Sequence, residues 1–349
     1  DSSSEIGTGH LARCIVLAKH LTKIKSEIVF ICRDHHGSAH ELVLEQNFRL
    51  HLLRGKAKRA ISSNYIDWLG CSQLQDASES SALIAGYPRS NVIVDHYSLD
   101  YLWESNIKCE SMTVIDDLAN RPHQCKLLID QSLKNTKLDY EKLIDSEFDF
   151  IGGNLVILRD EFGTGQKWHL PQSGKILICM GGADPQSYTL KILEQIVLSH
   201  KKCSEQQAVS EIIVIIGPAS SSYENIVSLA RKIKLKVSIL SAQKNISQLM
   251  LMSDLCILSC GTMILEACAL GVPSIGIAIA DNQKSTAQFL AKAGAVKLYD
   301  FNNEMGPNIY SAISSLINNP KELSDYSTKS KTMVSSASNE IIARRLCDL

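Results

Sequence analysis

The architecture of the chain first becomes visible in one short segment, Ile6-Gly7-Thr8-Gly9-His10-Leu11-Ala12. Its two glycines favour a tight turn, and the apolar residues that follow at helical spacing predict a helix that carries Arg13. Glycines let a backbone approach an anion closely, and the free amides at a helix start attract phosphate. The segment therefore predicts either an anion-binding loop of the G-x-G-x-x-A type, with Arg33-Asp34 placed to meet a ribose, or a tight turn without a ligand.

Short β-branched runs alternate with helical stretches along the whole chain, which is typical of parallel sheets covered by helices. We expect an α/β protein with two doubly wound, Rossmann-like parallel sheets that face a cleft at the carboxyl ends of their strands. The expected strands lie at 27–32, 49–53, 91–95, 112–116, 126–129, 175–180, 211–216, 236–240, 254–258 and 274–278, and helices begin near 101, 186, 223, 246, 262, 283, 320 and 338.

Two domains are expected, because 349 residues exceed what one core usually organises. The stretch 160–174 contains three glycines, Pro171 and little apolar periodicity, so it has the composition of a linker. We expect an N-terminal domain at 1–165 and a C-terminal domain at 166–349, whose last helix packs back across the first domain.

Composition excludes several classes of protein. The 36 Lys and Arg balance 37 Asp and Glu, so the net charge of -1 gives no electrostatic footprint of a nucleic-acid binder. No apolar run reaches the roughly 18 residues that a bilayer span needs. The 11 cysteines form no Cys-x-x-Cys pair, which argues against a zinc knuckle and fits the reducing cytoplasm.

His10 indicates proton transfer beside the predicted anion site, because a dinucleotide loop normally has small residues there. The positive end of a helix disfavours an imidazolium, so we expect a neutral His10 that acts as a base near pH 7. A capping or packing histidine is the alternative. Asp95-His96-Tyr97 and Asp116-Asp117 follow predicted strands and would reach the same edge as Gly9 and Arg13. Their side chains either bind a sugar or cap helices. Asp116 and Asp117 have no third ligand at a suitable spacing, so the pair does not favour a metal site.

The second half offers two glycine turns between a strand and a helix. One is Met180-Gly181-Gly182-Ala183-Asp184-Pro185, an anion site or a bare turn. The other is Ser259-Cys260-Gly261-Thr262, followed by Glu266 one turn later and by Asn282-Gln283. Small residues and a hydroxyl at a helix start suit a diphosphate, and a glutamate there can accept both ribose hydroxyls, although an isolated helix glutamate is more often a solvated surface residue.

Taken together, these residues resemble the UDP-2,4-diacetamido-2,4,6-trideoxy-β-L-altropyranose hydrolases of pseudaminic acid biosynthesis, which are relatives of the GT-B nucleotide-sugar glycosyltransferases. The resemblance covers nearly the whole chain. It rests on Asp1, 6–14, Val94 to Tyr97 with Trp103-Glu104, 114–119, 158–162, 180–185, Gly261-Thr262 with Glu266, and Asn282-Gln283.

The resemblance implies a GT-B fold and a metal-independent, cofactor-free hydrolysis at the anomeric carbon that releases UDP with inversion. It assigns His10 as the base. We expect Gly9, Arg13, Asp95, His96, Tyr97 and Asp117 to bind the sugar, and Gly181, Gly182, Asp184, Gly261, Thr262, Glu266, Asn282 and Gln283 to bind UDP. Cys260 stands where the family has a glycine, so the approach of the diphosphate at this residue is left open. Family members carry a strand before the position of Asp1, so we expect one here.

Three other functions fit parts of the sequence. A GT-B glycosyltransferase with a UDP-N-acetylhexosamine donor would use the same UDP site, with a hydroxyl acceptor in place of water. A nicotinamide-dependent dehydrogenase would use Gly7-Thr8-Gly9 but leaves Thr262, Glu266 and Asn282-Gln283 unexplained. A catalytically silent nucleotide-sugar binding protein would need neither His10 nor Asp95-His96-Tyr97. The hydrolase is the leading hypothesis, with a small-molecule UDP-sugar as substrate and neither a nucleic acid nor a membrane as partner; the oligomeric state cannot be predicted from the sequence.

Overall fold

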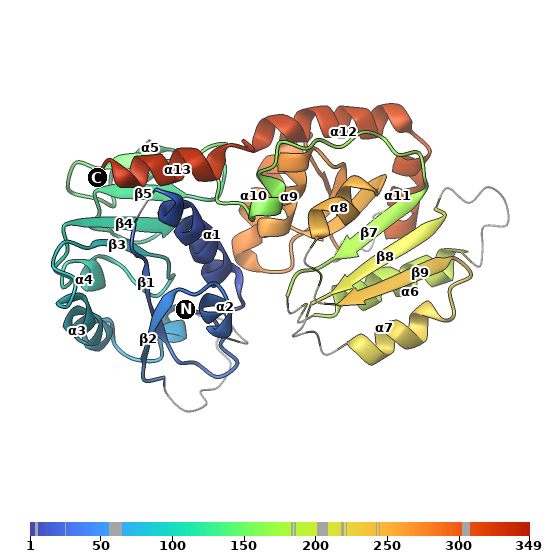
Figure 1. Cartoon of the computed structure of the whole chain (residues 1–349). Helices are drawn as coiled ribbons and strands as arrows, with labels where there is room; N and C mark the ends of the chain where they lie inside the picture. The colour runs from blue at the N-terminus through green and yellow to red at the C-terminus, as the bar shows by residue number, and fades with distance from the viewer. Residues whose placement is uncertain are drawn as a thin grey trace. The chain divides into compact units, whose positions relative to one another are not determined.

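A computed structural model shows an α/β chain that divides into two compact units (Figure 1). It describes residues 1–3, 6–24, 26–55, 65–182, 184, 186–200, 209–217, 220, 222–241, 243, 245–301 and 308–349. The first unit comprises 1–159 and 337–349, and the second comprises 160–336. The division falls after Arg159, a few residues before the boundary expected from composition.

The first unit contains two parallel sheets and the helices that cover them. Its strands are β1 (Val29–Arg33), β2 (Arg49–Leu53), β3 (Asn91–Val94), β4 (Ser111–Asp116), β5 (Leu127–Asp130) and β6 (Asp149–Ile151). Its helices are α1 (Gly9–Lys23), α2 (Glu41–Leu44), α3 (Gln73–Ile84), α4 (Tyr101–Glu104), α5 (Lys137–Tyr140) and α13 (Ser338–Cys347), with a short 3-10 helix η1 (Tyr65–Leu69). Strand β1 pairs with β2, and β3 to β6 pair in chain order, all in parallel.

A cavity of about 890 Å³ lies between β1 and β3. Its lining includes Val29 to Arg33 and Asn91 to Val94, the residues of the two strands, together with Asp1. Among the described residues, β1 and β3 have no strand partner on these facing sides. The two sheets of the first unit are thus separated by a slot that is open along two strand edges.

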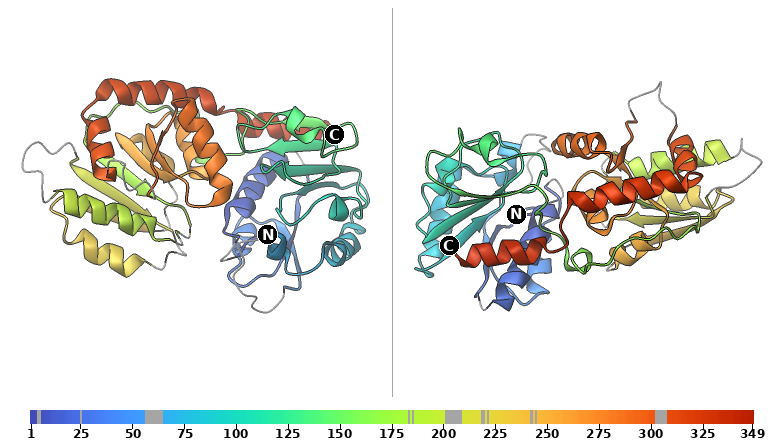
Figure 2. Two further views of the ribbon diagram at one scale, coloured as in Figure 1. Left: turned by 180° about the vertical axis from the view of Figure 1, so that it is seen from behind. Right: turned by 90° about the horizontal axis from the view of Figure 1, so that it is seen from above.

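Helix α13 completes the core of the first unit, beside α1 (Figure 2). Ile342, Ala343 and Leu346 are buried in one apolar cluster with Val16 and Leu17 of α1, and Ile115, Leu127 and Ile129 of the sheet belong to the same cluster. The apolar residues of α13 recur at helical spacing, so one face of the helix is buried while Arg344 and Arg345 stay outside.

The second unit is built on one six-stranded parallel sheet with the order β12-β11-β10-β7-β8-β9. Its strands are β7 (Lys175–Cys179), β8 (Glu211–Ile216), β9 (Lys236–Ser241), β10 (Leu255–Ser259), β11 (Ser274–Ile277) and β12 (Lys297–Leu298). Its helices are η2 (Asp160–Phe162), α6 (Tyr188–His200), α7 (Tyr223–Ala230), α8 (Ile246–Leu251), α9 (Thr262–Leu270), α10 (Asp281–Lys292), α11 (Ile309–Ile317) and α12 (Pro320–Met333). The order reverses between β7 and β10, which makes that position a topological switch point.

The ten expected strands are all present, with bounds within two residues of those expected. Strands β6 and β12 were not predicted, because three residues and two residues give no measurable periodicity. Strands β8 and β10 are fully buried and read in the sequence as continuous apolar runs, as parallel strands covered on both faces do.

Candidate active site

Five predicted site residues of the first unit meet at one sheet edge. His10 and Arg13 lie one turn apart on α1, so they project from the same face of that helix. Asp95 and Tyr97 follow β3, and Asp117 follows β4. Because β3 and β4 pair in parallel through Val94 and Val114, the residues after them leave the sheet at the same edge.

Asp95 binds both His10 and Arg13. Its Oδ1 lies 2.6 Å from His10 Nδ1 and 2.6 Å from Arg13 Nη2, and its Oδ2 accepts a hydrogen bond of 2.6 Å from Arg13 Nε. The Asp95 side chain is 1% exposed, against 11% for His10. The Arg13 guanidinium thus binds the Asp95 carboxylate through two parallel hydrogen bonds, a bidentate geometry that is strong for this kind of pair.

The charge on Asp95 fixes the tautomer of His10. Burial alone would raise the pKa of Asp95, but the Arg13 guanidinium and His10 hold it well below its ordinary value. A charged carboxylate only accepts hydrogen bonds, so His10 Nδ1 carries the hydrogen. In the neutral form of the ring, Nε2 is then the atom with the lone pair, as in a histidine oriented by a carboxylate for general base catalysis.

Tyr97 and Asp117 extend this arrangement. Tyr97 Oη donates a hydrogen bond of 2.6 Å to Asp117 Oδ1, and Asp117 Oδ2 lies 3.4 Å from Arg13 Nη1. Burial and the Asp117 carboxylate raise the pKa of Tyr97 well above its ordinary value, so the phenol stays protonated. Its ring meets the His10 ring edge-on, with the centroids 4.6 Å apart.

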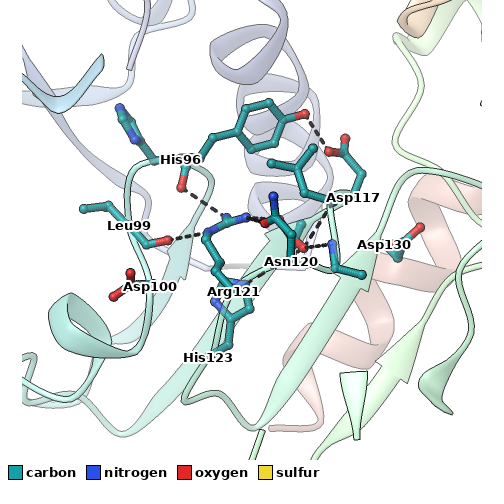
Figure 3. Close-up of polar contacts among 12 residues, drawn as sticks. His96, Leu99, Asp100, Asp117, Asn120, Arg121, His123 and Asp130 are labelled. Carbon is teal, nitrogen blue, oxygen red and sulfur yellow. Dashed lines mark hydrogen bonds and ion pairs between the residues drawn. The ribbon is translucent and has the colours of Figure 1, made fainter. Parts of the chain in front are cut away.

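A buried ionic network behind the site holds the loop that carries Asp117 (Figure 3). Asp116 Oδ1 pairs with Arg121 Nη1 at 2.6 Å, and Asp116 Oδ2 accepts hydrogen bonds from the amides of Leu118 and Ala119 and from Tyr140 Oη. Arg121 also donates to the carbonyls of Leu99 and His96. Arg121 therefore connects the loop after β4 to the loop after β3.

The structure does not bring His96 into this group. Its ring points away from Asp117 and Arg121 in Figure 3. Its Nδ1 accepts a hydrogen bond of 3.0 Å from the Ser98 amide, and its Nε2 lies 3.3 Å from Asp1 Oδ2. Burial lowers the pKa of His96 well below its ordinary value, so the ring is neutral. His96 stabilises the loop after β3, and a direct contact with a sugar stays a prediction.

In the second unit, the predicted UDP-binding glycines lie at the switch point of the sheet. Gly181 and Gly182 follow β7, and Gly261 follows β10, its neighbour in the sheet. Gly181 has a φ of +87°, a backbone conformation that favours glycine, and a Cβ there would lie 3.6 Å from Ser259 Oγ. Open α/β sheets bind ligands at such switch points, outside the carboxyl ends of the strands.

The N-terminus of α9 begins at this point. Gly261 is its N-cap residue and the exposed Thr262 its first residue, with no side-chain cap at this end. Gln283, in the first turn of α10, lies over Gly261, where an added Cβ would be 3.3 Å from Gln283 Nε2. Asn282 is exposed beside it. Glu266 is only 1% exposed, which contradicts the alternative of a solvated surface glutamate.

Asp184 is placed as a helix cap. Its two carboxylate oxygens accept hydrogen bonds of 2.8 and 2.9 Å from the amides of Tyr188 and Thr189 at the start of α6. Both oxygens are therefore engaged within the protein, which accounts for this residue without a ligand. Its neighbours in the predicted motif, Ala183 and Pro185, lie outside the described residues.

The side chain of Cys260, which stands where the family has a glycine, is buried against β11. Cys260 is 2% exposed, and its Sγ would be 2.7 Å from a Cβ placed on Gly276 of β11. Burial raises the pKa of its thiol to about 12. The sulfur thus fills the space that Gly276 leaves between β11 and α9 and does not cover the N-terminus of α9.

Two aromatic residues beside His10 were missed in the sequence. Tyr65 and Trp68 belong to η1, and both rings contact the ring of Tyr97. The Trp68 ring also meets the His10 ring edge-on, with the centroids 6.4 Å apart. Their segment has neither helical nor strand periodicity, so only the three-residue spacing of two aromatics signalled them. Arg121, the ion-pair partner of Asp116, is a further residue whose role was not predicted from the sequence.

Within the described ranges, no group of three or more His, Cys, Asp or Glu side chains is arranged to hold a metal ion. Nor does any helix in that part of the chain combine the length and the apolarity that crossing a membrane requires.

Several solved structures have a fold similar to that of this chain. The chain resembles MurG of Acinetobacter baumannii, with a TM-score of 0.68, 13% identity, and coverage of 98% of this chain and 96% of that one. It also resembles Anabaena Alr3699/HepE, solved in complex with UDP and glucose, with a TM-score of 0.59, 12% identity, and coverage of 100% and 98%. The fold is therefore that of the GT-B class of α/β proteins.

Sequence comparison is more specific. Residues 177–343 match the family model of the glycosyltransferase family 28 C-terminal domain, and most of this segment lies in the second unit. The chain is also 29% identical over 300 residues to the UDP-2,4-diacetamido-2,4,6-trideoxy-β-L-altropyranose hydrolase of Campylobacter jejuni. That match covers 84% of this chain and 95% of the relative.

Proposed function

We propose that this chain is an enzyme that hydrolyses a UDP-linked diacetamido-trideoxy sugar at the anomeric C–O bond, with inversion. One observation carries the proposal: Asp95 binds His10 Nδ1 at 2.6 Å, which orients the ring so that Nε2 can act as the base. The similarity to the Campylobacter jejuni hydrolase supports the substrate, and the family 28 domain supports a nucleotide-sugar ligand.

The chemistry requires one proton acceptor and one good leaving group. His10 Nε2 takes a proton from water while the water oxygen bonds to the anomeric carbon, and the C–O bond to the diphosphate breaks with its electron pair leaving on UDP. A single displacement of this kind inverts the carbon. Ordinary glycosidases add a second carboxyl acid because an alkoxide leaves poorly, whereas a diphosphate is already a stable anion.

Asp95 and Arg13 support His10 in two ways. The Asp95 carboxylate keeps the ring oriented and stabilises the imidazolium that forms when His10 takes the proton. Arg13 in turn keeps Asp95 charged, because its guanidinium lowers the pKa of that carboxyl group. We propose that Gly9, Tyr97 and Asp117, which lie beside this pair, contact the sugar.

The second unit supplies the nucleotide site in this proposal. The positive end of the helix dipole at the start of α9, with Thr262, suits the diphosphate, and Gly181 and Gly182 suit a close backbone approach after β7. Glu266 is buried one turn into α9 and suits the ribose hydroxyls. We further propose that Asn282 and Gln283 complete this site, that Asp184 acts there through the loop that it caps, and that the protein works in the cytoplasm without a metal or cofactor.

A GT-B glycosyltransferase is the second candidate, and the family 28 domain and the fold of MurG favour it. The two functions differ only in the acceptor, which is water in one and a hydroxyl in the other. Incubation with the UDP-sugar alone separates them, because a hydrolase releases UDP without any added acceptor and a transferase does not.

Replacement of His10 tests the proposed base. We expect His10→Asn to lower kcat for UDP release about 100-fold to 10,000-fold, the usual contribution of a general base, and to leave the Kd for UDP unchanged. His36→Asn, at an exposed histidine of the same unit, is the matched control and should keep wild-type turnover. Equal turnover of His10→Asn and wild type would refute the assignment of the base.

Isotope labelling tests which bond breaks. In water enriched in oxygen-18 the label should appear in the free sugar, because the water oxygen attaches to the anomeric carbon. Label in UDP would show attack at phosphorus and would contradict the proposed reaction. Proton NMR of the first product formed reports the anomer and therefore the inversion.

A further inference from the structure

Three aromatic rings form a cluster next to His10. The centroids of Tyr65 and Trp68 lie 4.9 Å apart, those of Tyr65 and Tyr97 5.1 Å apart, and those of Trp68 and Tyr97 5.9 Å apart. His10 meets Trp68 and Tyr97 edge-on at 6.4 and 4.6 Å. The proposed base therefore contacts both aromatic rings and the Asp95–Arg13 pair.

The members of the cluster differ in exposure. Tyr97 is 6% exposed and its hydroxyl is bound to Asp117, whereas Tyr65 and Trp68 are half-buried. Leu69, which follows Trp68, is buried in the core and anchors η1. The Tyr65 carbonyl accepts a hydrogen bond from Ser98 Oγ, which ties η1 to the loop after β3. The core contact of η1 thus comes from Leu69, and Trp68 keeps part of its surface in solvent.

We propose that Tyr65 and Trp68 form an apolar platform that binds the sugar beside His10 and selects sugars with methyl-bearing substituents. This inference rests on the proposed function and adds the residues that determine its sugar specificity. Aromatic rings present a negative face to the slightly positive C–H groups of an apolar partner. A 6-deoxy methyl and two acetamido methyls gain from burial against such rings, whereas the hydroxyls of glucose lose hydration there.

Substrate discrimination tests the platform. We expect Trp68→Ala to lower kcat/KM about 10-fold to 100-fold for the UDP-diacetamido-trideoxy sugar, the usual range for lost apolar contacts in a pocket. The loss for UDP-glucose should be less than threefold, so the preference collapses. Ile66→Ala, at a 73% exposed position of the same 3-10 helix, is the matched control and should change neither value. An equal loss for both substrates would indicate a structural role and overturn the proposal.

Tryptophan fluorescence gives a readout that does not need turnover. The chain has three tryptophans, and Trp103 and Trp168 are 5% and 3% exposed, so Trp68 is the one that a ligand can reach. We expect the UDP-diacetamido-trideoxy sugar, added to the His10→Asn variant, to change the emission in a saturable way. The change should disappear when Trp68→Phe is combined with His10→Asn, although calorimetry still detects binding.

The two proposals fail in different ways. If wild type releases no UDP from any UDP-sugar, the proposed hydrolysis is wrong, and the fluorescence titration still decides the platform. If wild type hydrolyses the substrate but saturating ligand leaves the emission of Trp68 unchanged, the platform is wrong and the hydrolysis stands.

Discussion

The side chain of His10 is oriented by a carboxylate that would not stay charged in its position without help. Asp95 is almost fully buried, and Arg13, one helical turn from His10, holds its charge with two hydrogen bonds. Burial therefore strengthens the interaction between Asp95 and Arg13, because an ion pair excluded from water is weakly screened and keeps one geometry. The cost of burying the charges is offset only while both partners are present.

Asp116 also depends on its charged neighbours to stay ionised while buried. Its pKa lets us predict how the stability of the first unit changes in acid. Burial would raise the pKa of Asp116, but Arg121 and His123 lower it below its ordinary value. A carboxyl group with a lowered pKa in the folded state stabilises the protein above its unfolded pKa of about 3.9, and this stabilisation is lost as the pH falls below that value.

We expect Asp116→Asn to lower the free energy of unfolding by about 3 to 5 kcal/mol at pH 7, because it leaves Arg121 without its buried partner. The variant should also lose less stability than wild type between pH 5 and pH 3, since one depressed carboxyl group is gone. Urea unfolding at the three pH values measures both effects. Asp145→Asn, at an exposed site, should follow the wild-type curve, and an unchanged acid slope in Asp116→Asn would contradict the prediction.

Several site residues could be predicted because their positions follow from chain topology. His10 starts a helix after a glycine turn, and Asp95 and Asp117 end strands, so parallel pairing alone brings them to one edge. Topology does not set the direction of a side chain. The contact of His96 with Asp1 could therefore not be predicted from the strand order. Trp68 was not predicted because η1 has no periodicity to mark it.

At the scale of elements, α1 connects the proposed site to the core. Its first turn carries His10 and Arg13, and its buried face carries Val16, Leu17 and Leu21, which pack in one cluster with α13. Helix α13 lies more than 300 residues away in the sequence, yet it supports the helix that holds the proposed base.

We therefore expect Ile342→Ala to lower the free energy of unfolding of the first unit by about 2 to 5 kcal/mol, the usual result of emptying a fully buried isoleucine site. Hydrogen exchange in α1, measured by mass spectrometry, should rise in this variant. Its neighbour Ile341, 40% exposed on the same helix, provides the control, because Ile341→Ala should stay within about 0.5 kcal/mol of wild type. Unchanged exchange in α1 would show that α13 does not support it.

The strands of both units could be predicted well from the sequence, because buried parallel strands are continuous apolar runs.

At the scale of the whole molecule, the chain passes into the second unit after Arg159 and returns after Ser336. The second unit is thus one continuous segment with its own six-stranded sheet, whereas the first unit is assembled from two separate segments. The last helix was expected to pack back across the first domain because terminal helices often do so, and composition placed the boundary between the units a few residues later than Arg159.

We expect residues 160–336 to fold when produced alone, with cooperative thermal unfolding, and to bind UDP. In this fragment Glu266→Gln should weaken UDP binding about 10-fold to 100-fold, the usual value of hydrogen bonds to a charged group. Calorimetric titration measures the Kd, and Glu224→Gln, at an exposed position of α7, should leave it unchanged. A folded fragment that ignores UDP would contradict the nucleotide site proposed for this unit.

The return of the chain also sets an order for biosynthesis. A ribosome releases the second unit as an uninterrupted stretch, which can reach its native state while translation continues. The earlier-made half must wait with an incomplete core until α13 emerges, and during that interval the apolar cluster between α1 and the sheet lacks Ile342, Ala343 and Leu346. We therefore expect the nascent N-terminal half to expose apolar surface for longer than the second unit does.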